Sequence, residues 1–301
     1  MRMEKPMNFN EELKIRTAGV QKIIEAWLPK AEGFQRTVLE AMNYSMLAGG
    51  KRLRPMLMQE TYHLFGGEGR IIEPFMAAME MIHTYSLVHD DLPALDGDEY
   101  RRGRKTTWVV YGETMGILAG DGLLNYAYET ACEAFKMEPG NPYIGQALSV
   151  LARKSGVYGM LGGQCTDVEA VGKTLSREKL DFIYRLKTSA LIEAAMMTGA
   201  ILAGAAKEDV EAVERIATDV GLAFQIQDDI LDVTSTTEEL GKPVLSDEKN
   251  EKTTYVTLEG MEKAKAEVER ISQNAIDTLD SLKAENEFLR ELIIHLINRK
   301  K

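Results

Sequence analysis

Apolar residues recur at helical intervals along almost the whole of this 301-residue chain. Between Val210 and Leu231 they follow three- and four-residue steps, as on one face of an amphipathic helix. No stretch shows the strict alternation that is typical of a half-buried strand. The same spacing predicts further helices at roughly 8–30, 34–48, 52–65, 73–91, 107–119, 121–136, 143–161, 176–204, 254–282 and 285–299.

Segments rich in glycine and proline separate these expected helices, at 66–69, 138–142 and 241–246. No linker of low complexity divides the chain, and its 45% hydrophobic content is enough for a sizeable core. We therefore expect one all-helical domain spanning residues 1–301.

Charge, cysteine content and hydropathy exclude several classes of protein. The formal net charge of -11 argues against a nucleic-acid binder, which needs a basic face. Cys132 and Cys165 are the only cysteines, so we do not expect a disulfide framework. We expect a reducing, cytoplasmic compartment instead. The most apolar window, 191–206, contains Glu193 and is shorter than the ~20 residues of a membrane span, which predicts a buried helix.

Two of the expected helices end in a pair of aspartates followed by a third. These residues are Asp90, Asp91 and Asp96 in the first group, and Asp228, Asp229 and Asp232 in the second. Apolar residues flank the second group, so like charges one turn apart would be unfavourable there without a cation. Carboxylate oxygens with no thiolate nearby indicate Mg²⁺, which completes its coordination with water and phosphates. The pattern predicts a phosphorylated ligand between the two helices.

Basic residues cluster at several points along the chain. They are Lys51, Arg52 and Arg54 after two glycines, Arg101, Arg102, Arg104 and Lys105 after the first aspartate group, and then Lys187 and Lys242. Taken alone, each resembles a solvated helix end, and there is no GxxxxGK[ST] phosphate loop. Together with two Mg²⁺ sites, they suggest two phosphorylated substrates held together.

The motifs GGKRLRP, HDDLPALD, YRRGRKTTW, GGQCTD, LKTSAL and FQIQDDILD resemble those of trans-isoprenyl diphosphate synthases, in the order of that family. Four residues separate the doubled aspartate from the last aspartate of the first motif, and Tyr85 lies five positions before Asp90. Both features are similar to the bacterial farnesyl diphosphate synthase type. The resemblance implies an isoprenoid synthase bundle of ten or more helices around a central cavity, and a homodimer.

The resemblance also implies a role for each matching residue. The Mg²⁺ ligands would be Asp90, Asp96 and Asp228, with Asp91 in support. Three Mg²⁺ ions are implied per active site, with Mn²⁺ as a substitute. The allylic substrate, dimethylallyl or geranyl diphosphate, would be held by the metals with Arg101, Lys187 and Lys242. Isopentenyl diphosphate would be held by Lys51, Arg54, His83 and Arg102. Thr188 and Gln225 would line the reacting carbon chain, and Tyr85 and Ser86 would set its length.

The implied activity is head-to-tail condensation through an allylic carbocation, with farnesyl diphosphate as the product. One departure concerns Lys242, which Pro243 follows, and Leu245 stands where the family has glycine. A geranylgeranyl diphosphate synthase remains an open alternative. A terpene cyclase would lack the second aspartate motif, and a non-catalytic partner subunit commonly loses one of the two.

Overall fold

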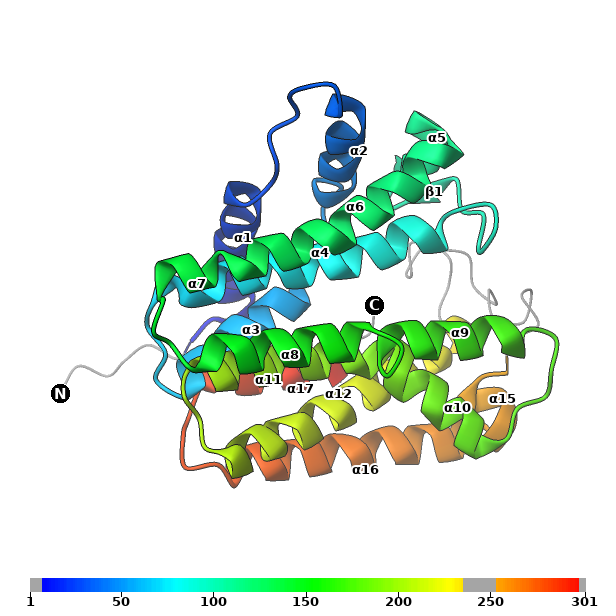
Figure 1. Ribbon diagram of the computed structural model, residues 1–301. Helices are drawn as coiled ribbons and strands as arrows, with labels where there is room; N and C mark the ends of the chain where they lie inside the picture. The colour runs from blue at the N-terminus through cyan, green and yellow to red at the C-terminus, as the bar shows by residue number, and fades with distance from the viewer. Residues whose placement is uncertain (1–6, 235–252, 298–301) are drawn as a thin grey trace. The chain divides into compact units, whose positions relative to one another are not determined.

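The computed structural model describes residues 7–234 and 253–297, shown in Figure 1. Lys242, Pro243 and Leu245 lie outside the described residues. Within that part of the chain the regular structure is helical, apart from a short antiparallel pairing of β1 (Tyr100–Arg101) with β2 (Arg104–Lys105). The all-helical expectation is therefore confirmed.

The chain divides into two compact units, each described by itself below. The first comprises residues up to 59 together with 68–148, and the second comprises 60–67 together with 149–301. Two helices cross the boundary, α3 (Leu53–Leu64) and α8 (Tyr143–Ser155).

The first unit is built around two long helices that run side by side, α4 (Glu73–Asp90) and α6 (Glu113–Cys132), as Figure 1 shows. Most side chains of α4 are buried, as expected for a helix that is apolar around most of its circumference. The remaining elements of this unit are α1 (Phe9–Ala26), α2 (Arg36–Met46), η1 (Arg70–Ile72), α5 (Thr107–Tyr111) and α7 (Ala134–Met137).

Close approach of α4 and α6 explains a helix end that the sequence predicted wrongly. The break expected at Gly120 is absent, and α6 continues through this residue. A Cβ atom at Gly120 would overlap the His89 imidazole, so the glycine serves the packing of α4 against α6 rather than a helix end. The actual break lies at Gly112, whose φ of 88° falls in the left-handed region that glycine adopts readily.

The second unit packs α12 (Lys207–Thr234) against α11 (Ala190–Leu202) and α16 (Met261–Asp280). The helix expected at 176–204 is interrupted, because a π-helical turn, η2 (Arg185–Ser189), joins α10 (Arg177–Tyr184) to α11. The helix expected at 143–161 also ends early, and a separate helix follows. The other elements of this unit are α9 (Met160–Ala170), α15 (Tyr255–Glu259) and α17 (Glu287–Ile297).

Helix α11 carries the most apolar window of the sequence and is buried along nearly its whole length, as predicted. Its one carboxylate, Glu193, is 1% exposed and accepts hydrogen bonds from Lys154 and from the Thr218 hydroxyl. These partners offset the cost of burying the charge. None of the described helices is both long enough and apolar enough to cross a membrane.

Candidate active site

The acidic end of α4 folds back on itself. Asp90 is the last residue of the helix, and the Asp96 amide donates to the Asp90 carbonyl oxygen over 2.9 Å. The turn thereby brings the first and last aspartates of the motif together, although five residues separate them. Asp90 is half-buried and Asp96 is exposed, so both carboxylates are accessible to a ligand.

Asp91 has a different environment from its neighbour. Its side chain is buried, and its Oδ1 accepts from both Nε and Nη2 of Arg101 at 2.6 Å. Burial raises the pKa of Asp91 to about 6, even though the Arg101 charge acts in the opposite direction. Asp91 therefore holds the guanidinium of Arg101, which also lies 3.6 Å from Asp98.

A basic pocket with a volume of about 560 Å³ lies beside the middle of α4. Its lining includes four of the residues predicted to bind isopentenyl diphosphate, namely Lys51, Arg54, His83 and Arg102. Arg54 Nη1 lies 3.4 Å from His83 Nε2, and the buried Nε of Arg54 has no hydrogen-bond partner within the described chain. A buried donor without an acceptor is costly, which points to an anionic ligand in this pocket.

The charge state of His83 follows from its neighbours. Burial, reinforced first by Arg54 and then by three further arginines, lowers the pKa of His83 well below its usual value. At neutral pH its imidazole is therefore uncharged, and one ring nitrogen can accept while the other donates.

The loop before α3 is shaped by a residue whose role the sequence did not reveal. Arg52 has a φ of 50° and is 3% exposed, unlike the other basic residues of its motif. Its guanidinium donates to Glu80 Oε1 at 2.5 Å, to Gln21 Oε1 at 2.8 Å and to the Met46 carbonyl at 2.6 Å. Arg52 thus anchors the loop, while its neighbours line the pocket.

Tyr85 and Ser86, the predicted chain-length residues, lie on α4 between the basic pocket and the aspartates. Tyr85 is buried, and its ring meets His89 edge to face with 5.8 Å between centroids. Burial, with smaller effects of Tyr128 and Asp90, raises the pKa of Tyr85 to about 12, so the phenol stays neutral. The Ser86 hydroxyl donates to the His83 carbonyl at 2.9 Å.

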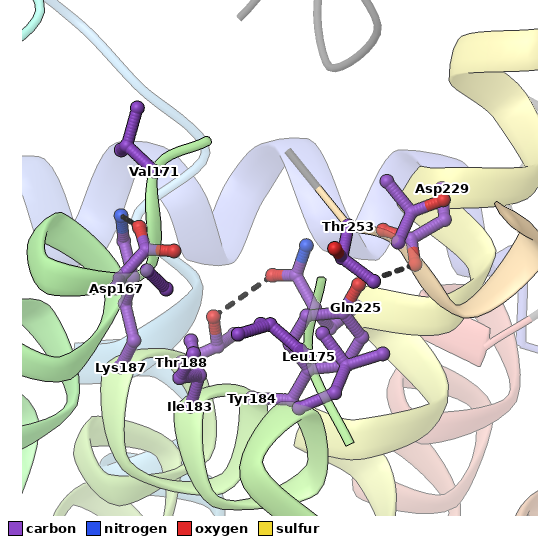
Figure 2. Close-up of a pocket in the computed structure, with 13 residues that line it drawn as sticks. Asp167, Val171, Leu175, Ile183, Tyr184, Lys187, Thr188, Gln225, Asp229 and Thr253 are labelled. Atoms are coloured by element: carbon purple, nitrogen blue, oxygen red, sulfur yellow. Dashed lines mark hydrogen bonds and ion pairs between the residues drawn. The ribbon is translucent and has the colours of Figure 1, made fainter. Parts of the chain in front are cut away.

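The second unit holds a smaller pocket of about 100 Å³, drawn in Figure 2. Lys187 Nζ donates to Asp167 Oδ2 at 2.6 Å, and the Thr188 hydroxyl donates to Gln225 Oε1 at 2.9 Å. One pocket is therefore lined by Lys187, predicted to hold the allylic diphosphate, and by Thr188 and Gln225, predicted to line the reacting carbon chain. Asp167, in the GGQCTD motif, is a partner of Lys187 that comes from a different helix, so its role could not be predicted from local sequence.

The aspartates of α12 differ from one another in burial. Asp228 is half-buried, whereas Asp229 and Asp232 are buried. Asp229 Oδ2 accepts from the Tyr184 hydroxyl at 2.5 Å and from the Tyr255 amide at 2.8 Å. It therefore connects α12 to the end of α10 and to the start of α15.

The donor chemistry of both acidic helix ends fits Mg²⁺. Among residues 7–234 and 253–297, no three His, Cys, Asp or Glu side chains gather closely enough to enclose a metal ion by themselves. Mg²⁺ does not require such a cage, because it commonly uses one or two carboxylates and takes its other ligands from water and substrate phosphates.

Comparison with known proteins decides the family. A model of the family described as Polyprenyl synthetase matches residues 35–292. The chain belongs to the polyprenyl synthetase family. It is a prenyltransferase, and most of its length is shared with relatives that make prenyl diphosphates.

Relatives within the polyprenyl synthetase family differ in their products. The farnesyl diphosphate synthase of Micrococcus luteus is 40% identical over 97% of this chain and all of its own. The geranylgeranyl diphosphate synthase of Cyanophora paradoxa is 41% identical over 90% of this chain and 91% of its own. A solved structure of the Helicobacter pylori geranyltransferase, complexed with magnesium and isoprenyl diphosphate, is 28% identical with a TM-score of 0.83, covering 98% of each chain.

Proposed function

We propose that this prenyltransferase condenses isopentenyl diphosphate with dimethylallyl or geranyl diphosphate, and that its main product is farnesyl diphosphate. The observation that carries the proposal is the basic pocket beside α4. It offers Lys51, Arg54 and Arg102 around a neutral His83, and the buried Arg54 Nε has no acceptor among residues 7–234 and 253–297. Cationic donors in a cleft suit a diphosphate, and a terpene cyclase has no need of this second diphosphate site.

The allylic diphosphate is assigned to the other set of basic residues. Arg101, fixed by Asp91, and Lys187, fixed by Asp167, present charged donors on short hydrogen bonds. Lys242 is added by family resemblance alone. These fixed cations stabilise the negative charge that develops on the leaving diphosphate, which lowers the barrier to C–O cleavage.

Asp90 at the end of α4, Asp96 in the turn that follows it, and Asp228 on α12 would hold the Mg²⁺ ions. When bound, Mg²⁺ would neutralise diphosphate charge and assist its departure as a Lewis acid. Three ions per active site, with Mn²⁺ as a substitute, are carried over from the family resemblance.

The remaining residues serve the carbon chain. The Thr188 hydroxyl and the Gln225 amide lie in the pocket of the second unit and are weakly polar neighbours for an allylic cation. The double bond of isopentenyl diphosphate attacks that cation, and a proton is then lost to the released diphosphate. No side-chain nucleophile is required.

Product length depends on Tyr85 and Ser86. The bulky Tyr85 ring, five residues below Asp90, lies about 7.5 Å along the helix axis at the usual rise per residue. A prenyl tail that grows away from the diphosphate reaches that depth after one or two additions. A geranylgeranyl product is the second candidate, because synthases of both products are about equally similar to this chain.

We further propose that the chain forms one catalytic domain over residues 1–301, acts as a cytoplasmic homodimer, and binds no nucleic acid. The single domain follows from the absence of a low-complexity linker in the sequence, and the dimer follows from the family resemblance. The compartment follows from the two unpaired cysteines, Cys132 and Cys165.

One experiment tests the proposal. Purified protein is incubated with isopentenyl and dimethylallyl diphosphates and Mg²⁺, and the prenyl products are separated by chain length. We expect mainly C15 product from the wild type and longer chains from Tyr85→Ala, with Phe135→Ala, an exposed site on α7, as the control that leaves length unchanged. Mostly C20 product from the wild type, or C15 product from Tyr85→Ala, would contradict the farnesyl assignment.

A further inference from the structure

Lys187 and Thr188 lie on the π-helical turn η2 rather than on a regular helix. Such turns carry wider backbone loops than an α-helix and occur often at functional sites. Figure 2 shows both side chains reaching their partners at the pocket wall. The question is what holds the turn in this conformation.

Helix α9 contacts one side of the turn through Gly163. A Cβ atom at Gly163 would lie 2.7 Å from the Leu186 carbonyl carbon and 2.9 Å from its Cβ, and closer still to the Lys187 amide nitrogen. Most of these atoms belong to the backbone, so rotation of a side chain could not relieve the overlap. Only glycine at this position allows α9 to approach η2 so closely.

Helix α12 contacts the other side of the turn through Gly221. A Cβ atom there would lie 2.5 Å from the Cβ and 2.7 Å from the Cα of Ser189, which is fully buried. Two glycines on different helices therefore touch the same five-residue turn, at its middle and at its last residue.

Each glycine is followed, one helical turn later, by the acceptor for a side chain of the turn. Asp167 comes four residues after Gly163 and accepts from Lys187, and Gln225 comes four residues after Gly221 and accepts from Thr188. Residues four apart lie on the same face of a helix. The glycine of each flanking helix thus sets how closely that helix approaches the η2 backbone. The acceptor on the same helix fixes the direction of one η2 side chain, Lys187 or Thr188.

We propose that Gly163 and Gly221 are positioning residues for prenyl transfer, which place Lys187 and Thr188 against the allylic substrate by letting α9 and α12 close on η2. The inference rests on the allylic roles proposed above for Lys187 and Thr188. It adds two residues that touch no substrate and act only through the backbone of the turn.

The expected effect follows from the geometry. Moving an overlap at 2.7 Å out to ordinary van der Waals contact requires a displacement of several tenths of an ångström or more. A displacement of about 1 Å in a positioning group can lower the rate on the order of 100-fold. Gly163→Ala should therefore lower kcat/KM for the allylic diphosphate by about 100-fold and leave KM for isopentenyl diphosphate unchanged.

The experiment compares Gly163→Ala and Gly221→Ala with two references. Gly145→Ala on α8 is the matched control, because a Cβ atom there meets nothing within 4 Å and activity should be unchanged. Lys187→Ala tests the proposed function, since it should raise KM for the allylic substrate. Thermal unfolding by circular dichroism confirms that each variant is folded, and Mg²⁺-dependent bisphosphonate binding measures the allylic site without turnover.

A folded Gly163→Ala that loses allylic kcat/KM and bisphosphonate affinity would support the proposal. So would Gly221→Ala that is partly rescued by Ser189→Gly, which removes the nearest side-chain atoms. If Lys187→Ala has the expected effect but both folded glycine variants behave like Gly145→Ala, the positioning role is overturned. It is also overturned if both glycine variants fail to fold, because the glycines would then serve the fold alone. If Lys187→Ala has no effect on the allylic substrate, the proposed function is at fault instead.

Discussion

The two acidic helix ends share a doubled aspartate but anchor it in different ways. In each pair the first residue, Asp90 or Asp228, is half-buried, and the second, Asp91 or Asp229, is buried. On α4 the buried carboxylate is held by a cation, the guanidinium of Arg101. On α12 the buried carboxylate accepts hydrogen bonds from a tyrosine hydroxyl and a backbone amide, both neutral donors among the residues that the structure describes.

This difference indicates that the two aspartates of each pair have separate roles. The first aspartate of each pair is available to a metal, while the second supports the structure around it. On α4 that support orients Arg101, which has a proposed role in catalysis. On α12 it joins three helices of the second unit through Tyr184 and Tyr255, so its loss should affect folding more than chemistry.

The largest effect should come from removing a first aspartate. Asp90→Ala and Asp228→Ala should each lower kcat by about 10³-fold or more, because each removes a ligand at the charge that develops in the transition state. Circular dichroism should show an unchanged fold. Near-normal turnover of either folded variant would break the proposed division of tasks.

Loss of the second aspartate of α12 should mainly reduce stability. Asp229→Ala removes the carboxylate that the Tyr184 hydroxyl and the Tyr255 amide share, and each buried donor left without an acceptor costs about 1–3 kcal/mol. We expect the free energy of unfolding in urea to fall by about 2–6 kcal/mol. Asp229→Asn, which keeps an acceptor oxygen, should lose less, and equal losses would argue that charge matters more than hydrogen bonding.

The basic residues beside the two helix ends should separate the two substrates. Arg54→Ala should raise KM for isopentenyl diphosphate by about 10- to 100-fold, equivalent to about 1.4–2.7 kcal/mol, with little change for the allylic diphosphate. Lys187→Ala should have the opposite pattern. Equal effects on both substrates in steady-state kinetics would show that the basic pocket has been assigned to the wrong substrate.

The smallest effect concerns pH and only the end of α4. Burial raises the pKa of Asp91 to about 6, above the value of about 3.9 for an unfolded chain. The folded state therefore binds this proton more tightly, so the contribution of Asp91 to stability is fully present below about pH 3.9 and is lost as the pH rises through about 6. Between pH 7 and pH 5 the metal-free wild type should gain about 1 kcal/mol relative to Asp91→Asn. No difference between the two pH profiles would contradict the buried environment of Asp91.

Much of this arrangement could be predicted from the sequence, because helical spacing and the ordered motifs are local features. The aspartate groups, the basic clusters and the position of His83 on the helix that ends at Asp90 follow from such features. The distinction between Asp91 and Asp229 does not, since it depends on partners that come from other segments of the chain.

Three other features that the sequence did not predict also depend on contacts between distant segments of the chain. LKTSAL resembles ordinary helix, and the π-turn is evident only when Gly163 and Gly221 are brought against it. Gly120 suggests a helix end in sequence, but in the structure it makes room for His89. Arg52 has a basic side chain like its neighbours Lys51 and Arg54, and only its three hydrogen bonds, two of them buried, identify it as an anchor.

The separation of tasks within each aspartate pair is tested most directly by calorimetric binding of a bisphosphonate, with and without Mg²⁺, to four variants that preserve side-chain size. We expect Asp90→Asn and Asp228→Asn to lose Mg²⁺-dependent binding. Asp229→Asn should retain it wherever the protein is folded, and Asp91→Asn should weaken it only several-fold through the loosened Arg101. Equal loss of binding in all four folded variants, or full binding by Asp90→Asn or Asp228→Asn, would contradict the account.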